Sequence, residues 1–249
     1  MAKISAFGTI LRRGVCQVET STVVGTVTGS GNVHVVCTST SITGSPLQTV
    51  VAVLITDTAD TVATKIRAGI GAVAAITLNF VVGGSGQYVT LTPKVAVADE
   101  GALNIDYHMD TGTGLTNDLT SDTTTTGVAP VAIAYVTNIG GPGLALDTQD
   151  VTTHDQASAF EEVVATLLRS GEVKVDLVYD PNNATHSAAA NGLIDDIENK
   201  ILAYYQLVFP GPYTWSFSGH GTGFEPSEAV DGALTASATL KITGAPTLV

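Results

Sequence analysis

The chain has 249 residues, of which 13% are charged and 6% aromatic, and its formal net charge at pH 7 is −13. No stripe of Lys and Arg is present to neutralise phosphates, so tight nucleic-acid binding is disfavoured, and no apolar run reaches the roughly 18–20 residues of a membrane span. The N-terminus, Met-Ala-Lys-Ile-Ser, lacks the apolar stretch of a signal peptide. We therefore expect a soluble protein that is made in a cytoplasm and either stays there or is assembled from it.

The order of the segments predicts one domain interrupted by another. Residues 3–13 read as a β-strand, and the natural hairpin partner at 131–137 follows only after a block rich in Thr, Val and Gly. Insertion is tolerated at exposed turns whose ends lie close together, and a hairpin tip meets both conditions. We expect a discontinuous domain made of residues 1–14 and 131–249, with an inserted domain at 15–130.

The inserted block predicts an α+β module of about six strands and one helix. The helix covers residues 57–70, with Asp57 or Thr58 as its N-cap. The apolar positions on one stripe of this helix are Val62, Ile66 and Ile70. Strand-like runs are found at 16–24, 32–38, 49–55, 76–82, 88–92 and 103–107. A Gly-rich hairpin turn is expected at 83–86, and residues 111–127 read as a polar linker.

The C-terminal segment predicts a β-rich domain with one or two helices. An amphipathic helix is expected at 157–169, ending before Gly171. Its apolar face comprises Phe160, Val163, Val164, Leu167 and Leu168. A second helix is expected at about 188–199, capped by Thr185 or Ser187. The predicted strands are 172–179, which alternates strictly, 203–209, 213–218 and 233–243. We expect 203–209 and 233–243 to be exposed sheet edges, which need partners.

A series of short motifs in this C-terminal segment resembles the major tail tube protein of long-tailed (siphovirus-type) bacteriophages. The motifs occur in order and with short spacings across the whole domain. They are Val136–Pro142, Asp150–Asp155, Gly171–Asp176, Tyr179–His186, Trp215–Gly219, Phe224–Pro226 and Leu240–Pro246. The block at 15–130 departs from the family pattern, in which the first strand runs directly into the second.

The resemblance implies a mainly β fold, a β-sandwich or half-barrel of the tail-tube type with one or two flanking helices, plus the inserted small α+β module. It also implies homo-hexameric rings that stack into a hollow tube, located in the virion tail and assembled in the host cytoplasm. A tape measure protein would fill the tube before ejection, and genomic DNA would pass through without tight binding. The alternative is a cell-surface or adhesive β-protein, which the Thr-rich block favours and the missing export signal opposes.

Two sets of residues are candidates for assembly functions. Strands with one apolar face and one small polar face suit a sheet that packs on a core and lines a watery channel. The lumen-facing candidates are Lys174, Asp176, Thr235, Ser237 and Thr239. The long segment 147–171 is a candidate inter-ring loop, because long loops are usually functional. Its candidate residues are Asp147, Asp150, His154, Phe160 and Leu167.

Nothing in the sequence predicts an enzyme, a cofactor or a metal site. The histidines, His34, His108, His154, His186 and His220, form no HxxxH or HExxH spacing. Cys16 and Cys37 do not have zinc-site spacing, and whether they pair stays open. Asp and Glu exceed Lys and Arg in both domains, fourteen to seven in the discontinuous domain and nine to three in the insert. Short polar side chains with net negative charge would not grip a phosphate backbone.

The inserted domain cannot fit inside a channel that must pass a DNA duplex, so we expect it to project outward. An outward knob on every subunit would obstruct a contractile sheath, which favours a non-contractile tail. Its role, either contact between neighbouring subunits or binding to the host surface, stays open at this point.

Overall fold

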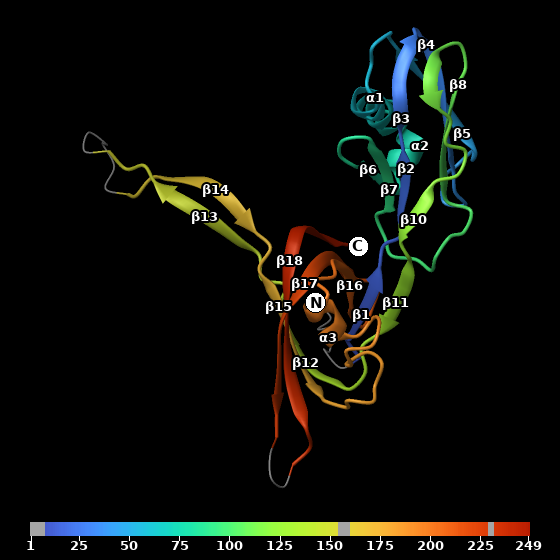
Figure 1. The fold of residues 1–249 in the computed structure, drawn as a ribbon. Coiled ribbons are helices and arrows are strands. Elements are labelled where there is room, and N and C mark those ends of the chain that lie inside the picture. The colour runs from blue at the N-terminus through green and yellow to red at the C-terminus, as the bar shows by residue number, and fades with distance from the viewer. Residues whose placement is uncertain (1–7, 154–159, 229–231) are drawn as a thin grey trace. The chain divides into compact units, whose positions relative to one another are not determined.

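The computed structural model describes residues 8–153, 160–228 and 232–249, and the fold is mainly β with few helices (Figure 1). The expected fold class is confirmed at this level. Contacts divide the chain into two compact units. Unit 1 comprises Met1–Arg13 with Pro130–Val249, and unit 2 comprises Gly14–Ala129.

Unit 1 is built on a seven-stranded sheet with the order β11-β1-β16-β17-β18-β15-β12. Its strands are β1 (Ile10–Val15), β11 (Val128–Ala132), β12 (Val136–Gly140), β15 (Glu172–Val178), β16 (Ala203–Val208), β17 (Thr214–Ser227) and β18 (Thr235–Leu248). The strands β16 and β18 lie inside the sheet, so the expectation that 203–209 and 233–243 form its edges was wrong. The edges are β11 and β12.

The connection between the two edge strands forces the sheet to curve. Flat strands spaced about 4.8 Å apart would place β11 and β12 about 29 Å from each other, yet residues 132 and 136 are at most about 15 Å apart along the chain. The sequence-based prediction of one strand at 131–137 was wrong because the chain crosses here from one edge to the other. Tyr135, in the crossing, has a left-handed backbone with φ of 55°.

Buried His186 holds this crossing in place. Its Nε2 lies 2.8 Å from the Ala134 carbonyl oxygen, and its Nδ1 accepts a hydrogen bond of 3.3 Å from the Asp180 backbone N–H. These two contacts assign the proton to Nε2. The Val178 N–H donates to the Tyr135 carbonyl at 3.0 Å. The histidine therefore has a structural role, and the crossing is fixed to β15.

The curved sheet encloses the core of unit 1. Alternate residues of β15 and β18 point inward, and each inward side chain is at least 95% buried. They are Val173, Val175, Leu177, Ala236, Ala238, Leu240 and Ile242. The second predicted helix is present only as α3 (Leu193–Glu198). Its N-cap is Gly192 with no side-chain cap bond, so capping by Thr185 or Ser187 was wrong.

The described part of the segment predicted as a helix at 157–169 is not helical, and residues 163–169 form a strand instead. β14 (Val163–Arg169) pairs antiparallel with β13 (Ala145–Asp150) in a two-stranded sheet of its own. Two glycines form the base of this hairpin, Gly141 with φ of +105° and Gly171 with φ of +68°. A Cβ at Gly171 would collide with the Gly143 carbonyl oxygen, so only glycine fits there.

Unit 2, all of whose residues are described, has its own core. Its strands are β2 (Val18–Thr22), β3 (Val24–Gly29), β4 (Gly31–Thr38), β5 (Leu47–Val53), β6 (Phe80–Gly83), β7 (Tyr88–Pro93), β8 (Asn104–Met109), β9 (Thr113–Thr116) and β10 (Asp122–Thr125). They form three sheets, β10-β2-β7-β6, β3-β9 and β5-β4-β8. The two helices are α1 (Ala59–Gly71) and α2 (Ala74–Thr77).

The helix prediction for unit 2 is confirmed, and two other predictions are corrected. The residues Val62, Ile66 and Ile70 are fully buried, and the Thr58 hydroxyl accepts from the Thr61 N–H at 3.4 Å. The strand expected at 76–82 begins later, because residues 74–77 form α2. The polar segment 111–127 is not a plain linker, since it contributes β9 and β10 to two sheets.

The described residues contain neither a disulfide bond between the two cysteines nor a membrane-spanning helix. Cys16 and Cys37 are both free thiols. Within the described ranges, no helix combines the length and hydropathy that crossing a bilayer would need.

Candidate functional site: the polar sheet face and the exposed hairpin

The five lumen-facing candidates lie together on the outer face of β15 and β18. The register pairs Lys174 with Thr239, Asp176 with Ser237, and Val178 with Thr235. Because side chains alternate across a strand, these positions face away from the core that the intervening residues fill. The structure thus brings all five onto one continuous polar surface, called the polar face below.

Asp176 is the centre of a hydrogen-bond network on the polar face. Ser237 Oγ donates to its Oδ1 at 2.6 Å, and Asn138 Nδ2 donates to its Oδ2 at 3.0 Å. The Ser237 bond, followed by the Asn138 bond, lowers the pKa of the Asp176 carboxyl below its ordinary value. Three strands, β12, β15 and β18, are therefore connected by one carboxylate.

Sequence reasoning missed Asn138, since its role depends on a β-bulge in β12. The register of β12 against β15 shifts between Val136 and Asn138. The shift allows Val136 and Ile139 both to pack against the core while Asn138 faces Asp176. Periodicity alone would place Val136 and Asn138 on the same face, so no sequence signal identified the pair.

The hairpin β13–β14 exposes large apolar side chains on both faces. Every described residue of β14 is exposed, and in Figure 1 the two strands extend away from the seven-stranded sheet. Its exposed apolar residues include Leu144, Leu146, Val163, Val164, Leu167 and Leu168. Phe160, beyond the end of β14, is 82% exposed. A two-stranded hairpin is marginally stable in water by itself, and this one presents apolar surface that a partner would cover.

Polar side chains make contacts along the hairpin, and one of these contacts joins its two strands. Arg169 donates from Nε to Asp147 Oδ2 at 2.7 Å, and this contact lowers the pKa of the Asp147 carboxyl. Asp150 Oδ1 accepts from the Thr152 N–H at 2.8 Å, and hydrogen bonds to Thr152 lower its pKa. Of the inter-ring candidates, Asp147, Asp150, Phe160 and Leu167 thus lie on the hairpin. His154 lies outside the described residues.

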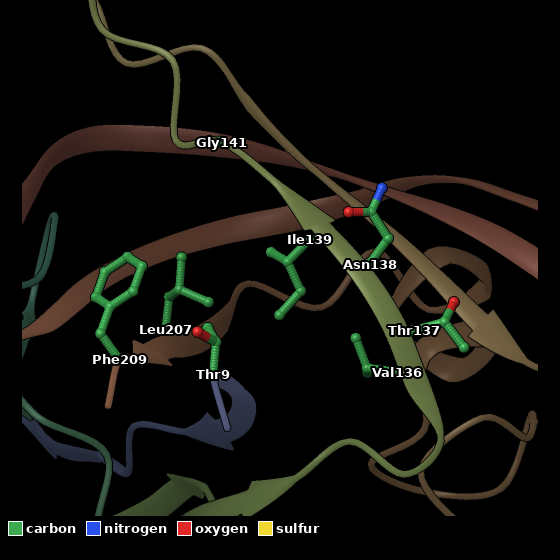
Figure 2. Close-up of a pocket in the computed structure, with 8 residues that line it drawn as sticks. All are labelled: Thr9, Val136, Thr137, Asn138, Ile139, Gly141, Leu207 and Phe209. Carbon is green, nitrogen blue, oxygen red and sulfur yellow. The ribbon is translucent and has the colours of Figure 1, made fainter. Parts of the chain in front are cut away.

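A cavity of about 200 Å³ lies between β12 and the end of β16. Figure 2 shows Val136 and Ile139 directed from β12 toward Leu207 and Phe209, with Thr9 beside them. The wall is mixed, because Thr9, Thr137 and Asn138 line it beside the apolar side chains. The Oγ1 atom of Thr9 is buried and has no hydrogen-bond partner among the described residues.

A buried ion pair, unpredicted from the sequence, fixes β1 within unit 1. Arg13 donates to both carboxylate oxygens of Asp196, with a distance of 3.0 Å from Nε to Oδ2. The Tyr205 hydroxyl donates to Asp196 Oδ2 at 2.7 Å, and Arg13 also reaches Asn191 Oδ1 at 2.8 Å. Burial, together with the Asp196 charge, raises the pKa of Tyr205 well above its ordinary value.

The other described histidines and the two cysteines do not form a cluster of ligand or catalytic groups. In unit 2, His34 and His108 face each other across β4 and β8, with ring centroids 5.4 Å apart. Each contacts a different carboxylate, Asp110 at 3.3 Å and Asp106 at 3.2 Å respectively. In the part of the chain that the structure describes, no group of three His, Cys, Asp or Glu residues could hold a metal ion.

No family model matches the sequence, and no curated protein matches it. Among solved structures, a chain of the native gene transfer agent virion has a TM-score of 0.41 at 11% identity, covering 48% of this chain and 88% of that one. A chain of the empty gene transfer agent tail, refined with C6 symmetry, has a TM-score of 0.41 at 13% identity, with 48% and 86% covered. A chain of the six-fold symmetrised anti-feeding prophage baseplate has a TM-score of 0.37 at 10% identity, with 48% and 83% covered. Over about half its length, the chain is similar to chains of these virion, tail and baseplate particles.

Proposed function

We propose that this chain is a structural subunit of a bacteriophage tail tube, in which hexameric rings stack into a hollow tube that conducts the genome into the host cell. One observation carries the proposal. Unit 1 combines a curved sheet that has a polar outer face with a hairpin whose apolar side chains are exposed on both sides. A monomer would leave these apolar side chains exposed to water, whereas a subunit packed between identical neighbours can bury them. The ordered tail-tube motifs of the flanking segments support the same function.

In this proposal the polar face lines the tube. Its short side chains, Ser237, Thr235 and Thr239, leave space for a duplex. Its one lysine, Lys174, and the neighbouring Lys241 do not form a continuous cationic stripe. Lys241 Nζ lies 3.3 Å from Glu172 Oε1, which offsets its charge. DNA that passes the polar face would therefore keep its counterions, because no row of protein cations is present to replace them. Before ejection the same bore would hold a tape measure protein.

The hairpin would connect one subunit to the next. Its two strands pair with each other and leave both faces available, so a neighbouring copy can cover the apolar side chains at positions such as Leu167 and Leu168. The edge strands β11 and β12 also carry backbone groups that a neighbour can pair with. Closure of the ring would remove these edges.

Unit 2 would project outward and act as a decorating or stabilising domain on a non-contractile tail. Its exposed surface has few aromatic side chains, and Tyr107 is buried, which disfavours sugar binding through ring stacking. Catalysis is not part of the proposal, because no catalytic arrangement is found among the described residues.

Negative-stain electron microscopy and mass photometry of the purified full chain test the proposal. We expect rings or striated tubes with a central hole, and masses at multiples of one subunit that include six. The test should cover a range of concentrations and include a sample seeded with preformed tail tips, since nucleation can limit assembly. Monomers under all these conditions, without rings or tubes, would refute a tail-tube function.

A further inference from the structure

We infer that the free edge of β5 in unit 2 is a self-association surface, through which two copies of this chain pair their β5 strands antiparallel about a two-fold axis. The inference does not depend on the proposed function, because a two-fold contact is distinct from the head-to-tail contacts that close a ring. Three observations carry it: the direction of the backbone groups of β5, the chemistry of its side chains, and the match between the residues at its two ends.

The backbone of β5 directs half of its polar groups away from its own sheet. β5 is the outer strand of the sheet β5-β4-β8. In β4, the Asn32 carbonyl accepts from the Asp110 N–H at 3.0 Å, on the side away from β5. Asn32 faces Ala52, so this pair does not exchange hydrogen bonds, and the alternation of an antiparallel ladder gives Val50 and Gln48 the same state. The N–H and C=O groups of Gln48, Val50 and Ala52 therefore point to the free edge.

An antiparallel second copy of β5, centred on Val50, pairs all of these groups. Val50 would exchange two hydrogen bonds with Val50 of the second copy, and Gln48 would do the same with Ala52 of the second copy. The side-chain faces also agree, because the three exposed positions meet exposed positions and buried Val51 stays on the core side. A shift by one residue would place these groups opposite groups that are already bonded to β4.

The side chains of β5 leave this edge open to pairing. The strand Leu47–Val53 contains no charged residue and no proline, and its register against β4 has no bulge. Charges, prolines and bulges are the usual features that keep a sheet edge from pairing with another chain. The edges of the seven-stranded sheet have them, since β11 contains Pro130 and β12 has a bulge. Two copies of β5 meet without like-charge repulsion, and they would cover Val50, which is 54% exposed.

The residues at the two ends of β5 match each other. With Val50 at the centre, Pro46 lies opposite Leu54 of the second copy, and both side chains are exposed. Pro46 has no N–H, so the hydrogen-bonded ladder ends there, and its ring would pack against the Leu54 side chain. The backbone of Leu54 is fixed, because its N–H donates to Asp57 Oδ2 at 2.7 Å. The two-fold axis repeats this apolar contact at both ends of the pair.

Crosslinking between two charge variants tests the inference on the full chain. One preparation carries Val50→Lys, and a second, isotopically heavy preparation carries Val50→Glu. The two are mixed and treated with a carbodiimide, which joins an amine directly to a carboxylate. Opposite Cα atoms of a hydrogen-bonded pair lie about 5.5 Å apart, so we expect an amide bond between position 50 of the light chain and position 50 of the heavy chain.

The matched control mixes Val81→Lys with Val81→Glu, at a residue of β6 that is 53% exposed. We expect no bond between the two copies of position 81. Crosslinks that join position 50 only to other positions, or no crosslink from position 50 to the heavy chain, would overturn the inference.

Sedimentation velocity provides a quantitative test. The background is the full chain with Phe160→Ser and Leu167→Ser, two changes outside unit 2 that are intended to stop polymerisation from hiding a dimer. We expect Val50→Lys to raise the dimer dissociation constant about tenfold, because like charges then face each other. A mixture of Val50→Lys and Val50→Glu should restore the dimer, and Val81→Lys should leave it unchanged.

A mixture that associates no more strongly than Val50→Lys alone, or a background that gives no dimer at about 1 mM, would overturn the inference. These outcomes are separate from the test of the proposed function. Tubes without a contact at position 50 would overturn only this inference, whereas dimers with that contact and no tubes would overturn only the proposed function.

Discussion

Ser237 Oγ and Asp176 Oδ1 lie 2.6 Å apart across the β15–β18 pair, on the solvent side of the curved sheet. The bond connects two of the residues expected to line a channel. It lowers the pKa of the Asp176 carboxyl and keeps a negative charge on the polar face.

The first prediction follows from this pKa. A carboxyl whose folded pKa lies below its unfolded value contributes stability above the unfolded pKa, near 3.9, and loses this contribution as the pH falls through the folded value. Ser237→Ala should therefore reduce the loss of unit 1 stability between pH 5 and pH 2. The effect should be below about 1 kcal/mol, because the group is close to solvent. Urea unfolding of both proteins at several pH values measures it, with Thr235→Ala as the control. A pH dependence identical to that of the natural chain would contradict the prediction.

The second prediction concerns the buried pair of Arg13 and Asp196. Arg13→Ala leaves the Asp196 carboxylate buried without its cationic partner, which typically costs about 3–5 kcal/mol. Tyr205→Phe removes one hydrogen bond to the same carboxylate and should cost about 1 kcal/mol. Calorimetry should show the unit 1 transition shifted and the unit 2 transition unchanged. Equal effects of the two substitutions would show that the ion pair is not the main interaction.

The third prediction concerns the hairpin. The double substitution Phe160→Ser and Leu167→Ser should abolish polymerisation while unit 1 stays folded, because both side chains are exposed and outside the core. Electron microscopy reports assembly, and circular dichroism with thermal unfolding reports the fold. The control is Leu78→Ser, at a residue of unit 2 that is 69% exposed. Normal tubes from the double variant would show that the hairpin is not the connector.

The fourth prediction concerns unit 2. The apolar cores of the two units share no residue, and β1 and β11, which lead into and out of unit 2, are neighbours in the sheet. Deleting residues 15–129 and joining Gly14 to Pro130 should leave a folded domain. Its tubes should have the normal bore and a smaller outer diameter, as measured by electron microscopy. If the shortened chain does not fold, the division into host and inserted domain is wrong.

The fifth prediction concerns the free thiols. Burial raises the pKa of Cys16 to about 11 and that of Cys37 to about 12. At pH 8 about 0.1% of Cys16 is then thiolate, the reactive form. Both thiols should react slowly with Ellman's reagent in the folded chain and rapidly in urea. Rapid reaction of Cys16 without denaturant would show that its surroundings open in solution.

Elements with a single strong period were predictable from the sequence. The alternation of Val173, Val175 and Leu177 matches β15, and the stripe of Val62 and Ile66 matches α1. Burial on one face is encoded in the local order of residues, so no distant contact is needed to read it. The polar face was accessible for the same reason, because each of its residues occupies the alternate position of a strand.

The segment 157–169 was not predictable in this way. Phe160, Val163, Val164 and Leu167 fit a helical stripe, yet the same residues are exposed around β14. Pairing with β13, thirteen or more residues earlier in the sequence, decided the strand. Local periodicity cannot distinguish apolar residues that pack on their own domain from apolar residues that stay exposed on it.

The sequence by itself determined the mainly β class, the alternating strands, the helix of unit 2 and the positions of the polar face. Only the tertiary structure decided the strand order, the crossing that places β11 and β12 at opposite edges, the Arg13–Asp196 pair and the cavity between β12 and β16. The physical reason is the range of the interactions. Alternation and helical stripes depend on residues a few positions apart, whereas strand order, a buried ion pair between residues 183 positions apart and the walls of a cavity depend on contacts formed only after the sheet has curved.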